Sequence, residues 1–401
     1  MIEQTTTKAK AYFPALTGIR AIAAYLVFFY HFGPARLPWP CIAKDSGLAA
    51  YIEEWHVGVT LFFVLSGFLI ATRYQDSVQL TGKWAFRYFR NRFARIYPLY
   101  FLVTLLAFVS FQLNPTWDGT EQWPNYVHYD KPMVVVLNLT FLRGFFEKFI
   151  FTGLAQGWTL TVEECFYALA PLLLLTLKRR WQLLFGHAAA LPLLGFLLVY
   201  VSNATGLATR YYEFMGSYQF MLNFTFFGRC IEFFVGMGLA LYLKRYPQQV
   251  AKGWKITAVS VLWMAGCIYI LSMVETPLDL FKGTMDYRGI AVNNLLLPLG
   301  VVGLLYGLIY EQNWFQALLQ TQPAQALGKS SYAFYLVHMS TFQVVLREYV
   351  TESVAIQFIL LVALSWVLFH FIEEPIQKRL TGSKSVAARK AAVDCEPVTR
   401  Y

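Results

Sequence analysis

Arg20 and His31 are the residues whose types and spacing first suggest chemistry in this chain. Ten residues, almost all apolar, separate them. In one α-helix, at about 1.5 Å of rise per residue, they lie about 16 Å apart. Such groups are costly inside lipid unless they face a cavity or a partner. The pair therefore predicts a reaction path or a transport path through a membrane helix.

His31 has two carboxylates as candidate partners, Glu163 and Glu164. A neutral imidazole can accept a proton near pH 7, which suits a general base or an acyl carrier; a plain hydrogen bond to a neighbour is the alternative. The two glutamates lie about a turn and a half into an apolar segment that begins at Gly157. At that depth, close to the depth of His31, a carboxylate could orient the ring and stabilise the imidazolium. Contact with lipid headgroups is the alternative for either glutamate.

A basic segment follows the second apolar run. It contains Arg73 and then five cations between residues 83 and 95, against the single acid Asp76. Arg92 and Arg95 are three residues apart and share one helical face, a spacing that suits forked hydrogen bonds to a diphosphate. Short cytoplasmic loops collect arginine in any membrane protein, which is the alternative.

Two short-range patterns favour structural roles. Ser66 and Gly67 interrupt an apolar run, as small residues do where two membrane helices pack closely. Arg229 and Glu232 are three residues apart on one helical face, so they could pair with each other.

Tyr332, Tyr335 and His338 follow one another at spacings of three within a single apolar segment. They share one face of a helix. Either they line a cavity or they form a satisfied polar seam between helices.

The composition defines the class of protein. Hydrophobic residues make up 57% of the 401 residues and charged residues only 14%. Such a chain cannot cover a soluble surface, and its apolar runs of about 20 residues predict a polytopic membrane protein that is all-α. The five cysteines fit neither a disulfide framework nor a metal-ligand spacing, so we expect no metal site.

About ten spans are expected, and one further segment is ambiguous. The spans are predicted near residues 16–33, 55–72, 96–113, 157–177, 182–201, 221–243, 256–274, 290–310, 331–350 and 354–372. The segment 133–150 is also apolar but carries Asn138, Arg143, Glu147 and Lys148. If it crossed, the later basic loops would exchange sides, so we expect a non-spanning or re-entrant helix there.

With this topology, the Lys and Arg residues are distributed unequally between the two sides of the membrane. Most of the 33 Lys and Arg fall in the predicted cytoplasmic segments, which places both termini in the cytoplasm. The net charge of +10 reflects this topology, with some attraction to anionic membrane lipid, and predicts no nucleic-acid partner. We divide the chain into a membrane domain, residues 1–375, and a basic cytoplasmic tail, residues 376–401.

From about Phe13 to Pro375 the chain resembles the acyltransferase type 3 family of integral membrane enzymes. The resemblance is carried by Arg20 with His31, by Arg92 with Arg95, by Trp158, Thr159, Leu160, Glu163 and Phe166, by the run 62–70 around Ser66, and by Ser331, Tyr332, Tyr335, Leu336 and His338. The family often begins with Asp-Gly-Leu-Arg-Gly, but Thr17 replaces that aspartate here. Some relatives append a soluble esterase-like domain after the last helix; without one, the membrane part is expected to complete the transfer or to pass the acyl group to a partner.

The resemblance implies an activity and the roles of its residues. It implies acyl transfer, most often of acetyl, from acyl-coenzyme A as cosubstrate, with no bound cofactor, to a carbohydrate or glycolipid outside the cytoplasm. It favours Glu163 over Glu164 as the partner of His31. Donor phosphates are expected on Arg92 and Arg95, with Arg20 or Arg73.

The resemblance also implies supporting residues and a location. Trp158, Ser66, Tyr332, Tyr335 and His338 are expected to support the cavity, and the protein is expected in the cell inner membrane. A small secondary metabolite is the alternative acceptor. The oligomeric state and the choice between direct transfer and an acyl-enzyme stay open.

A secondary transporter is the rival class, since transporters also bury His, Glu and Arg. We find no half-chain repeats of the kind that transporters carry. Release of coenzyme A by the purified protein would distinguish the enzyme from a transporter or a sensor.

Overall fold

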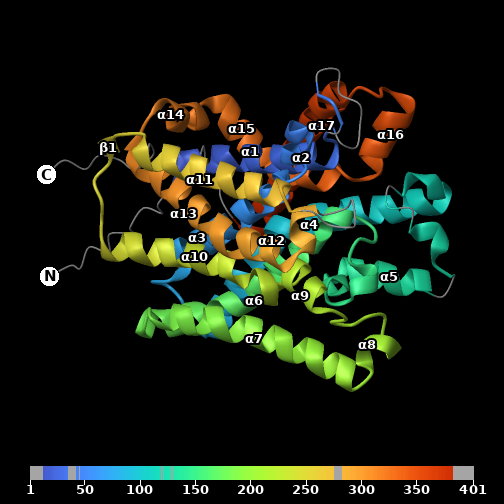
Figure 1. Ribbon diagram of the computed structural model, residues 1–401, viewed down its shortest axis with the longest axis horizontal. Helices are drawn as coiled ribbons and strands as arrows, with labels where there is room; N and C mark the ends of the chain where they lie inside the picture. Colours follow the sequence, from blue (N-terminus) through green and yellow to red (C-terminus); the bar gives the residue numbers. More distant parts are fainter. Residues whose placement is uncertain are drawn as a thin grey trace, which may run out of the picture.

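The computed structural model describes residues 12–34, 42–44, 46–118, 120, 122–127, 130–274 and 282–382. Within these ranges the chain is almost entirely helical, as the composition predicts. Two short strands, β1 (Ala251–Lys252) and β2 (Glu311–Gln312), pair in parallel. The long helices lie side by side along one direction (Figure 1), so the protein is an all-α polytopic bundle.

The described chain forms eighteen α-helices. They are α1 (Pro14–His31), α2 (Gly47–Ile52), α3 (Gly58–Tyr74), α4 (Gly82–Leu113), α5 (Asp130–Leu139), α6 (Trp158–Arg179), α7 (Leu183–Ala204), α8 (Leu207–Arg210), α9 (Tyr218–Phe224), α10 (Phe226–Arg245), α11 (Lys255–Ser272), α12 (Tyr287–Ala291), α13 (Leu297–Tyr310), α14 (Trp314–Gln320), α15 (Gln322–Val337), α16 (Thr341–Tyr349), α17 (Val354–Leu368) and α18 (Glu374–Thr381). Two π-helical turns, Val292–Leu296 and Phe369–Glu373, join α12 to α13 and α17 to α18.

Eight helical segments of the described chain are long and apolar enough to cross a membrane. Each coincides with one of the ten predicted spans. The other two predictions are 16–33 and 331–350. The first corresponds to α1, whose 18 residues include the polar Arg20 and His31.

The prediction of one span over 331–350 is wrong. The helix α15 begins earlier, at Gln322, and ends at Val337. The Ser340 side chain then accepts a hydrogen bond from the Phe342 N–H and starts the separate helix α16. Serine favours this N-cap position, so the polar residues after Val337 end one helix and begin another.

The helices α3 and α10 pack closely through small residues, as predicted around Ser66 and Gly67. A methyl group at Gly67 would lie 2.8 Å from the Phe233 carbonyl carbon, and one at Gly236 would lie 2.9 Å from the Phe68 nitrogen. Without side chains there, the two backbones approach to contact distance. This contact fixes the depth of α3 within the bundle.

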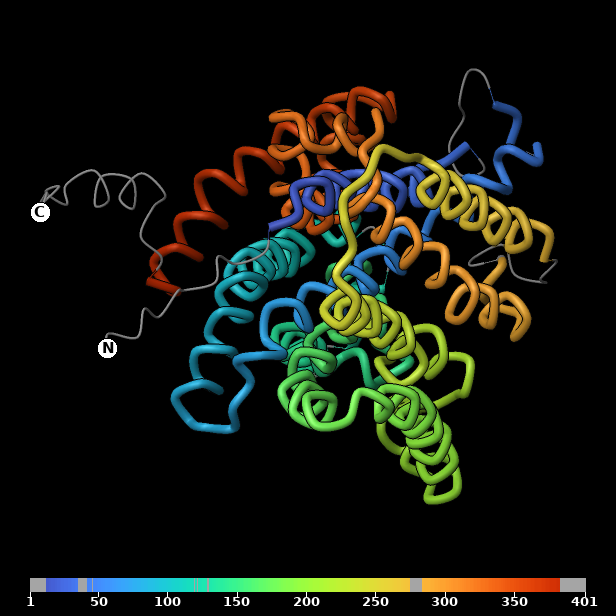
Figure 2. Tube along the Cα trace, turned by 90° about the vertical axis from the view of Figure 1, so that its left-hand side faces the viewer, coloured from blue at the N-terminus to red at the C-terminus, as the bar shows by residue number. Residues whose placement is uncertain are grey.

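One end of the bundle, which we call the basic end, gathers many charged residues. The Asp76 carboxylate pairs with Lys244, and the backbone carbonyl of Asp76 accepts a hydrogen bond from Lys178 at 3.2 Å. The first turn of α1 lies there too, since Gln325 donates to the Pro14 carbonyl at 2.8 Å. The end of α18 lies beside the start of α4 (Figure 2). That the basic end faces the cytoplasm stays a prediction.

The segment between α4 and α6 is no span, in agreement with the prediction for 133–150. The helix α5 has only ten residues, and the chain then folds inward as short turns. Arg143, fully buried, donates hydrogen bonds to Asn138 Oδ1 at 2.7 Å, to the Leu154 carbonyl at 2.5 Å and to the Thr152 carbonyl. These bonds hold the inward turn in place just before α6.

The division into a membrane domain, residues 1–375, and a basic tail, residues 376–401, stays a prediction. The helix α18 runs from Glu374 to Thr381 and so crosses the predicted boundary between the two parts. Residues 383–401 of the predicted tail lie outside the described residues.

Candidate active site

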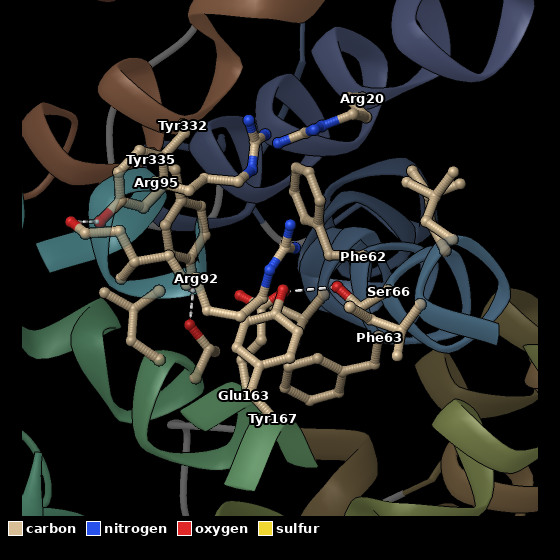
Figure 3. A pocket seen from close by; sticks show the side chains of 17 residues that line it. Arg20, Phe62, Phe63, Ser66, Arg92, Arg95, Glu163, Tyr167, Tyr332 and Tyr335 are labelled. Atoms are coloured by element: carbon tan, nitrogen blue, oxygen red, sulfur yellow. Dashed lines mark hydrogen bonds between the residues drawn. The ribbon is translucent and has the colours of Figure 1, made fainter. Parts of the chain in front are cut away.

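A cavity of about 90 Å³ lies between α1, α3, α4, α6 and α15, toward the basic end. We call it the cationic chamber. Three arginines line it, Arg20 from α1 and Arg92 and Arg95 from α4, with one carboxylate, Glu163 from α6. Figure 3 shows the arginine side chains reaching into the same space. The excess of positive charge makes this chamber suitable for an anionic ligand.

Arg92 is held between aromatic rings. Its guanidinium carbon lies 5.4 Å from the centroid of the Tyr167 ring and 5.8 Å from that of Tyr74. Cation–π contacts of this kind restrict the side chain while leaving its N–H groups available for hydrogen bonds. The chain therefore orients Arg92 in advance, in the same chamber as Arg95.

Glu163 belongs to the cationic chamber. Its carboxylate accepts hydrogen bonds from the Tyr167 hydroxyl, at 2.5 Å, and from the Ser66 hydroxyl. His31 lines a different cavity, and the contact expected between Glu163 and His31 stays a prediction.

The inward turn before α6 explains this difference. From the sequence, α6 is expected to start at the membrane surface. In the structure α6 starts beside the middle of α4. Gly157 lies so close to Tyr100 that a methyl group added there would be 3.4 Å from the Tyr100 ring. Glu163 is therefore deeper than a count from the end of the span predicts.

Two residues expected to support the cavity line this chamber, whereas one residue expected to bind the donor lies outside it. Tyr332 and Ser66 line the chamber, and the Tyr332 hydroxyl donates to the Ile96 carbonyl at 2.7 Å. Arg73 lies outside it, exposed at the end of α3, with its guanidinium 5.9 Å from the centroid of the Tyr74 ring.

A second cavity, of about 340 Å³, lies at the opposite end of α1. We call it the histidine chamber, because His31 and His56 line it. Trp158, which we expected to support the site around Glu163, lines this chamber instead. The His56 ring nitrogen Nε2 lies 3.0 Å from the carboxylate of Glu54, which is 1% exposed.

His31 lies against a second imidazole. The ring centroids of His31 and His338 are 5.5 Å apart, with an angle of 40° between the planes. His338 is fully buried, and its Nδ1 is 2.8 Å from the Tyr335 carbonyl oxygen. Because a carbonyl only accepts, Nδ1 is assigned the proton, which leaves Nε2 as an acceptor.

The pair predicted between Arg229 and Glu232 is present in the wall of the histidine chamber. Two parallel hydrogen bonds of 2.7 Å join the guanidinium to the carboxylate. Arg229 also donates to the Thr60 hydroxyl at 3.2 Å, and its guanidinium carbon lies 5.4 Å from the centroid of the Phe63 ring. The charge of Arg229 is thus compensated within the protein.

The two chambers meet at Tyr335 and Val59, which line both. The Tyr335 hydroxyl lies 3.0 Å from the Thr159 hydroxyl and 3.2 Å from the Gln156 carbonyl. Tyr335 therefore lines a cavity, as one interpretation of its spacing expected, while His338 packs beside His31. Along α1, the cationic chamber at Arg20 is followed by the histidine chamber at His31.

The sequence reasoning missed four residues of these sites. Tyr167 is four residues after Glu163, and that helical spacing could have indicated it. Glu373 is buried, 3% exposed, and interacts electrostatically with Arg20 and Arg95. Gln156 and Asn223 line the histidine chamber, and no local pattern marks them.

The family model described as "Acyltransferase domain" matches residues 13–370, and the chain belongs to this family. It is therefore an acyltransferase, built as a multi-pass membrane protein.

Individual relatives are distant. The chain is 26% identical to "Acyltransferase MdmB" of Streptomyces mycarofaciens, over 81% of this chain and 78% of that protein. It is 24% identical to "O-acetyltransferase OatA" of Staphylococcus aureus, over 94% of this chain but only 58% of that protein. No solved structure matches the chain significantly.

Proposed function

We propose that this protein transfers an acyl group, most often acetyl, from acyl-coenzyme A to a hydroxyl group of a carbohydrate or glycolipid outside the cytoplasm. One observation carries the proposal: a chamber with excess positive charge and a chamber with a histidine lie at successive positions along α1 and share Tyr335. A phosphate-rich donor suits the first, and proton transfer from a hydroxyl suits the second.

The donor enters from the basic end. Arg92, Arg95 and Arg20 hold its phosphates by charge-assisted hydrogen bonds, and Arg73, at the exposed end of α3, meets the part of the nucleotide that stays outside. The pantetheine arm is of the same order of length as the roughly 16 Å between Arg20 and His31. It passes Tyr335 and brings the thioester toward the histidine chamber.

His31 then moves the proton. It accepts a proton from the acceptor hydroxyl, the oxygen attacks the thioester carbonyl carbon, and the carbon–sulfur bond breaks. The imidazolium returns the proton to the departing thiolate, so the products are an ester and free coenzyme A. In the second route His31 itself takes the acyl group and passes it to the acceptor, with the same net balance.

The named relatives and the topology support the remaining parts. One relative is named an O-acetyltransferase and another an acyltransferase, which agrees with transfer to oxygen. The excess of Lys and Arg at the basic end favours a cytoplasmic donor side and an acceptor on the far side of the inner membrane. A small hydroxylated metabolite is the alternative acceptor.

The test is thiol release by the purified chain in lipid nanodiscs supplied with acetyl-coenzyme A and cell-envelope glycans. We expect His31→Ala to lower the rate of coenzyme A release about 10²- to 10⁴-fold, because a general base contributes that much. His187→Ala is the matched control, since its Nε2 contacts Thr176 Oγ1 at 2.8 Å and it lines neither chamber. Activity of His31→Ala equal to that of the control would overturn the proposal.

A further inference from the structure

The charged side chains of the histidine chamber have partners within the protein. Of the described residues that line it, Arg229 is paired with Glu232 and His56 with Glu54. The cationic chamber differs, since its three arginines outnumber the two carboxylates beside them, Glu163 and Glu373. A neutral ligand loses the least solvation free energy on entering the histidine chamber. A charged ligand would be buried there with no free group of opposite charge in the described part of the wall to compensate it.

Two amide side chains of the histidine chamber are fixed in orientation. The Gln156 Nε2 donates to the carbonyls of Tyr335, at 3.1 Å, and Leu336, at 2.8 Å. The Asn223 Nδ2 donates to the Thr284 carbonyl at 2.9 Å. A flipped amide would place its oxygen against these carbonyls, which only accept, and would lose the hydrogen bonds. The oxygen of each amide therefore points away from the carbonyls.

The oxygens of these two amides have no hydrogen-bond partner among the described residues. Gln156 is 3% exposed and Asn223 is 2% exposed, and both line the chamber. Leaving a buried acceptor unpaired is unfavourable, so such groups usually have a partner or a function. Hydroxyl groups of a ligand are donors of the kind that would satisfy such acceptors.

The rest of the chamber limits the shape of the ligand. Trp158, Phe151 and Phe224 supply aromatic walls, and the Trp158 and Phe224 rings meet edge to face at 5.1 Å. The volume of about 340 Å³ is near the lower end of the range of ligand pockets, roughly 300–1,000 Å³. It suits a single ring better than a segment of a polymer.

We propose that Gln156 and Asn223 are the residues that recognise the acceptor, by accepting hydrogen bonds from the hydroxyls of a neutral ring in the histidine chamber. This inference rests on the proposed function and adds the residues that select the acceptor and the charge that they exclude. The ring is the end of an envelope glycan or a free hydroxylated metabolite; both offer the same donors.

The experiment uses the full chain in nanodiscs with acetyl-coenzyme A and a panel of methyl glycosides. The neutral members are the glycosides of glucose, galactose, mannose, rhamnose and N-acetylglucosamine; the charged members are the matching uronic acids and amino sugars. A hydroxylated macrocycle and an envelope glycan fraction test the two sources. We expect neutral compounds to stimulate coenzyme A release at least 10-fold more than their charged counterparts.

Variants of the two amide residues then test whether they bind the acceptor. We expect Gln156→Met and Asn223→Leu each to raise the KM for the best neutral acceptor about 10-fold, with the KM for acetyl-coenzyme A within twofold of wild type. Gln343→Met is the matched control: Gln343 is also 3% exposed and donates to Gln357 at 3.0 Å, but lines neither chamber. If either variant fails to fold, O-methylated acceptors tested on the wild-type chain replace it, and their KM should rise by the same factor.

Two results would overturn the inference while leaving the proposed function intact. One is equal stimulation by charged and neutral acceptors; the other is an unchanged acceptor KM in both variants and for the O-methylated acceptors. A wild-type chain that releases no coenzyme A under any condition would instead contradict the proposed function itself.

Discussion

The Arg229–Glu232 pair gives a quantitative test of how the histidine chamber is kept neutral. Replacing Arg229 by Met leaves the Glu232 carboxylate, 0% exposed, without its two hydrogen bonds of 2.7 Å. Breaking a buried ion pair from one side costs about 3–5 kcal/mol, because the remaining charge stays buried. The contact of the guanidinium with Phe63 adds roughly 0.5–2 kcal/mol, so we expect Arg229→Met to lower the free energy of unfolding by about 3.5–7 kcal/mol.

The double variant tests whether the loss of stability in each single variant comes from the charge that is left unpaired. Replacing Arg229 by Met and Glu232 by Leu together removes both charges, and exchanging a buried pair for apolar groups is often neutral. We expect the double variant to lie within about 2 kcal/mol of wild type, which makes the two single effects strongly non-additive.

The assay is reversible unfolding in mixed micelles, with the four proteins of the cycle measured under one condition. The exposed pair of Arg288 and Asp286, joined at 3.0 Å, is the control, and Arg288→Ala should unfold like wild type. The reasoning is refuted if either single variant at the buried pair loses less than about 1 kcal/mol, or if the double variant loses the sum of the single losses.

Three further predictions concern the donor site, the helix packing and the basic end. Replacing both Arg92 and Arg95 by Ala should raise the KM for acetyl-coenzyme A at least 10-fold with a smaller change in kcat, since each charge-assisted hydrogen bond contributes about 1.5–3 kcal/mol. Gly67→Leu should prevent stable folding, because its first side-chain atom already meets the backbone of α10. Burial raises the pKa of Glu311, but hydrogen bonds from the start of α11, including two from Thr257, outweigh it and lower the pKa below its usual value. Its ionised form therefore stabilises the fold above the pKa of the unfolded chain, and this stabilisation is lost as the pH falls through the lowered value. Glu311→Gln should cost about 0.5–2 kcal/mol at pH 7 and little in acid.

Each of these changes has its own control and measurement. Arg87→Ala, on the exposed side of α4, should leave the KM for the donor unchanged, and an equal rise there would argue against a specific donor site. Gly47→Ala should be tolerated, since a methyl group there meets no atom within 4 Å; detergent-resistant folding of Gly67→Leu would contradict the packing argument. For Glu311→Gln, the melting temperature is measured at pH 7 and in acid, and a difference from wild type that grows in acid would reverse the predicted sign.

Local patterns predicted those features that depend on neighbours along the chain. The pairing of Arg229 with Glu232 follows from a spacing of three in one helix, and the structure has it. Arg92 and Arg95 share a helical face for the same reason, and both line one chamber. The charges of the segment 133–150 indicated that it does not cross, and α5 with its following turns confirms this.

Depth and assembly could not be predicted in the same way. The depth of Glu163 depends on where α6 begins, and that point is set by Arg143 and its hydrogen bonds to the inward turn. Gln156 lies in a short 3-10 turn and Asn223 in the short helix α9, and neither position carries a pattern of its own. Their role depends on backbone carbonyls of segments that are distant in the sequence.

By itself the sequence determined that this is a helical membrane protein, where most of its spans lie, and which residues could carry acyl-transfer chemistry. Hydropathy and helical spacing are properties of short segments, so they can be determined without any knowledge of the fold. Only the tertiary structure decided that Glu163 joins the arginines while His31 lies beside His338 in a separate chamber. The reason is physical: the partner of a buried polar group is chosen by the packing of whole helices, and small residues such as Gly67 set how deeply those helices engage.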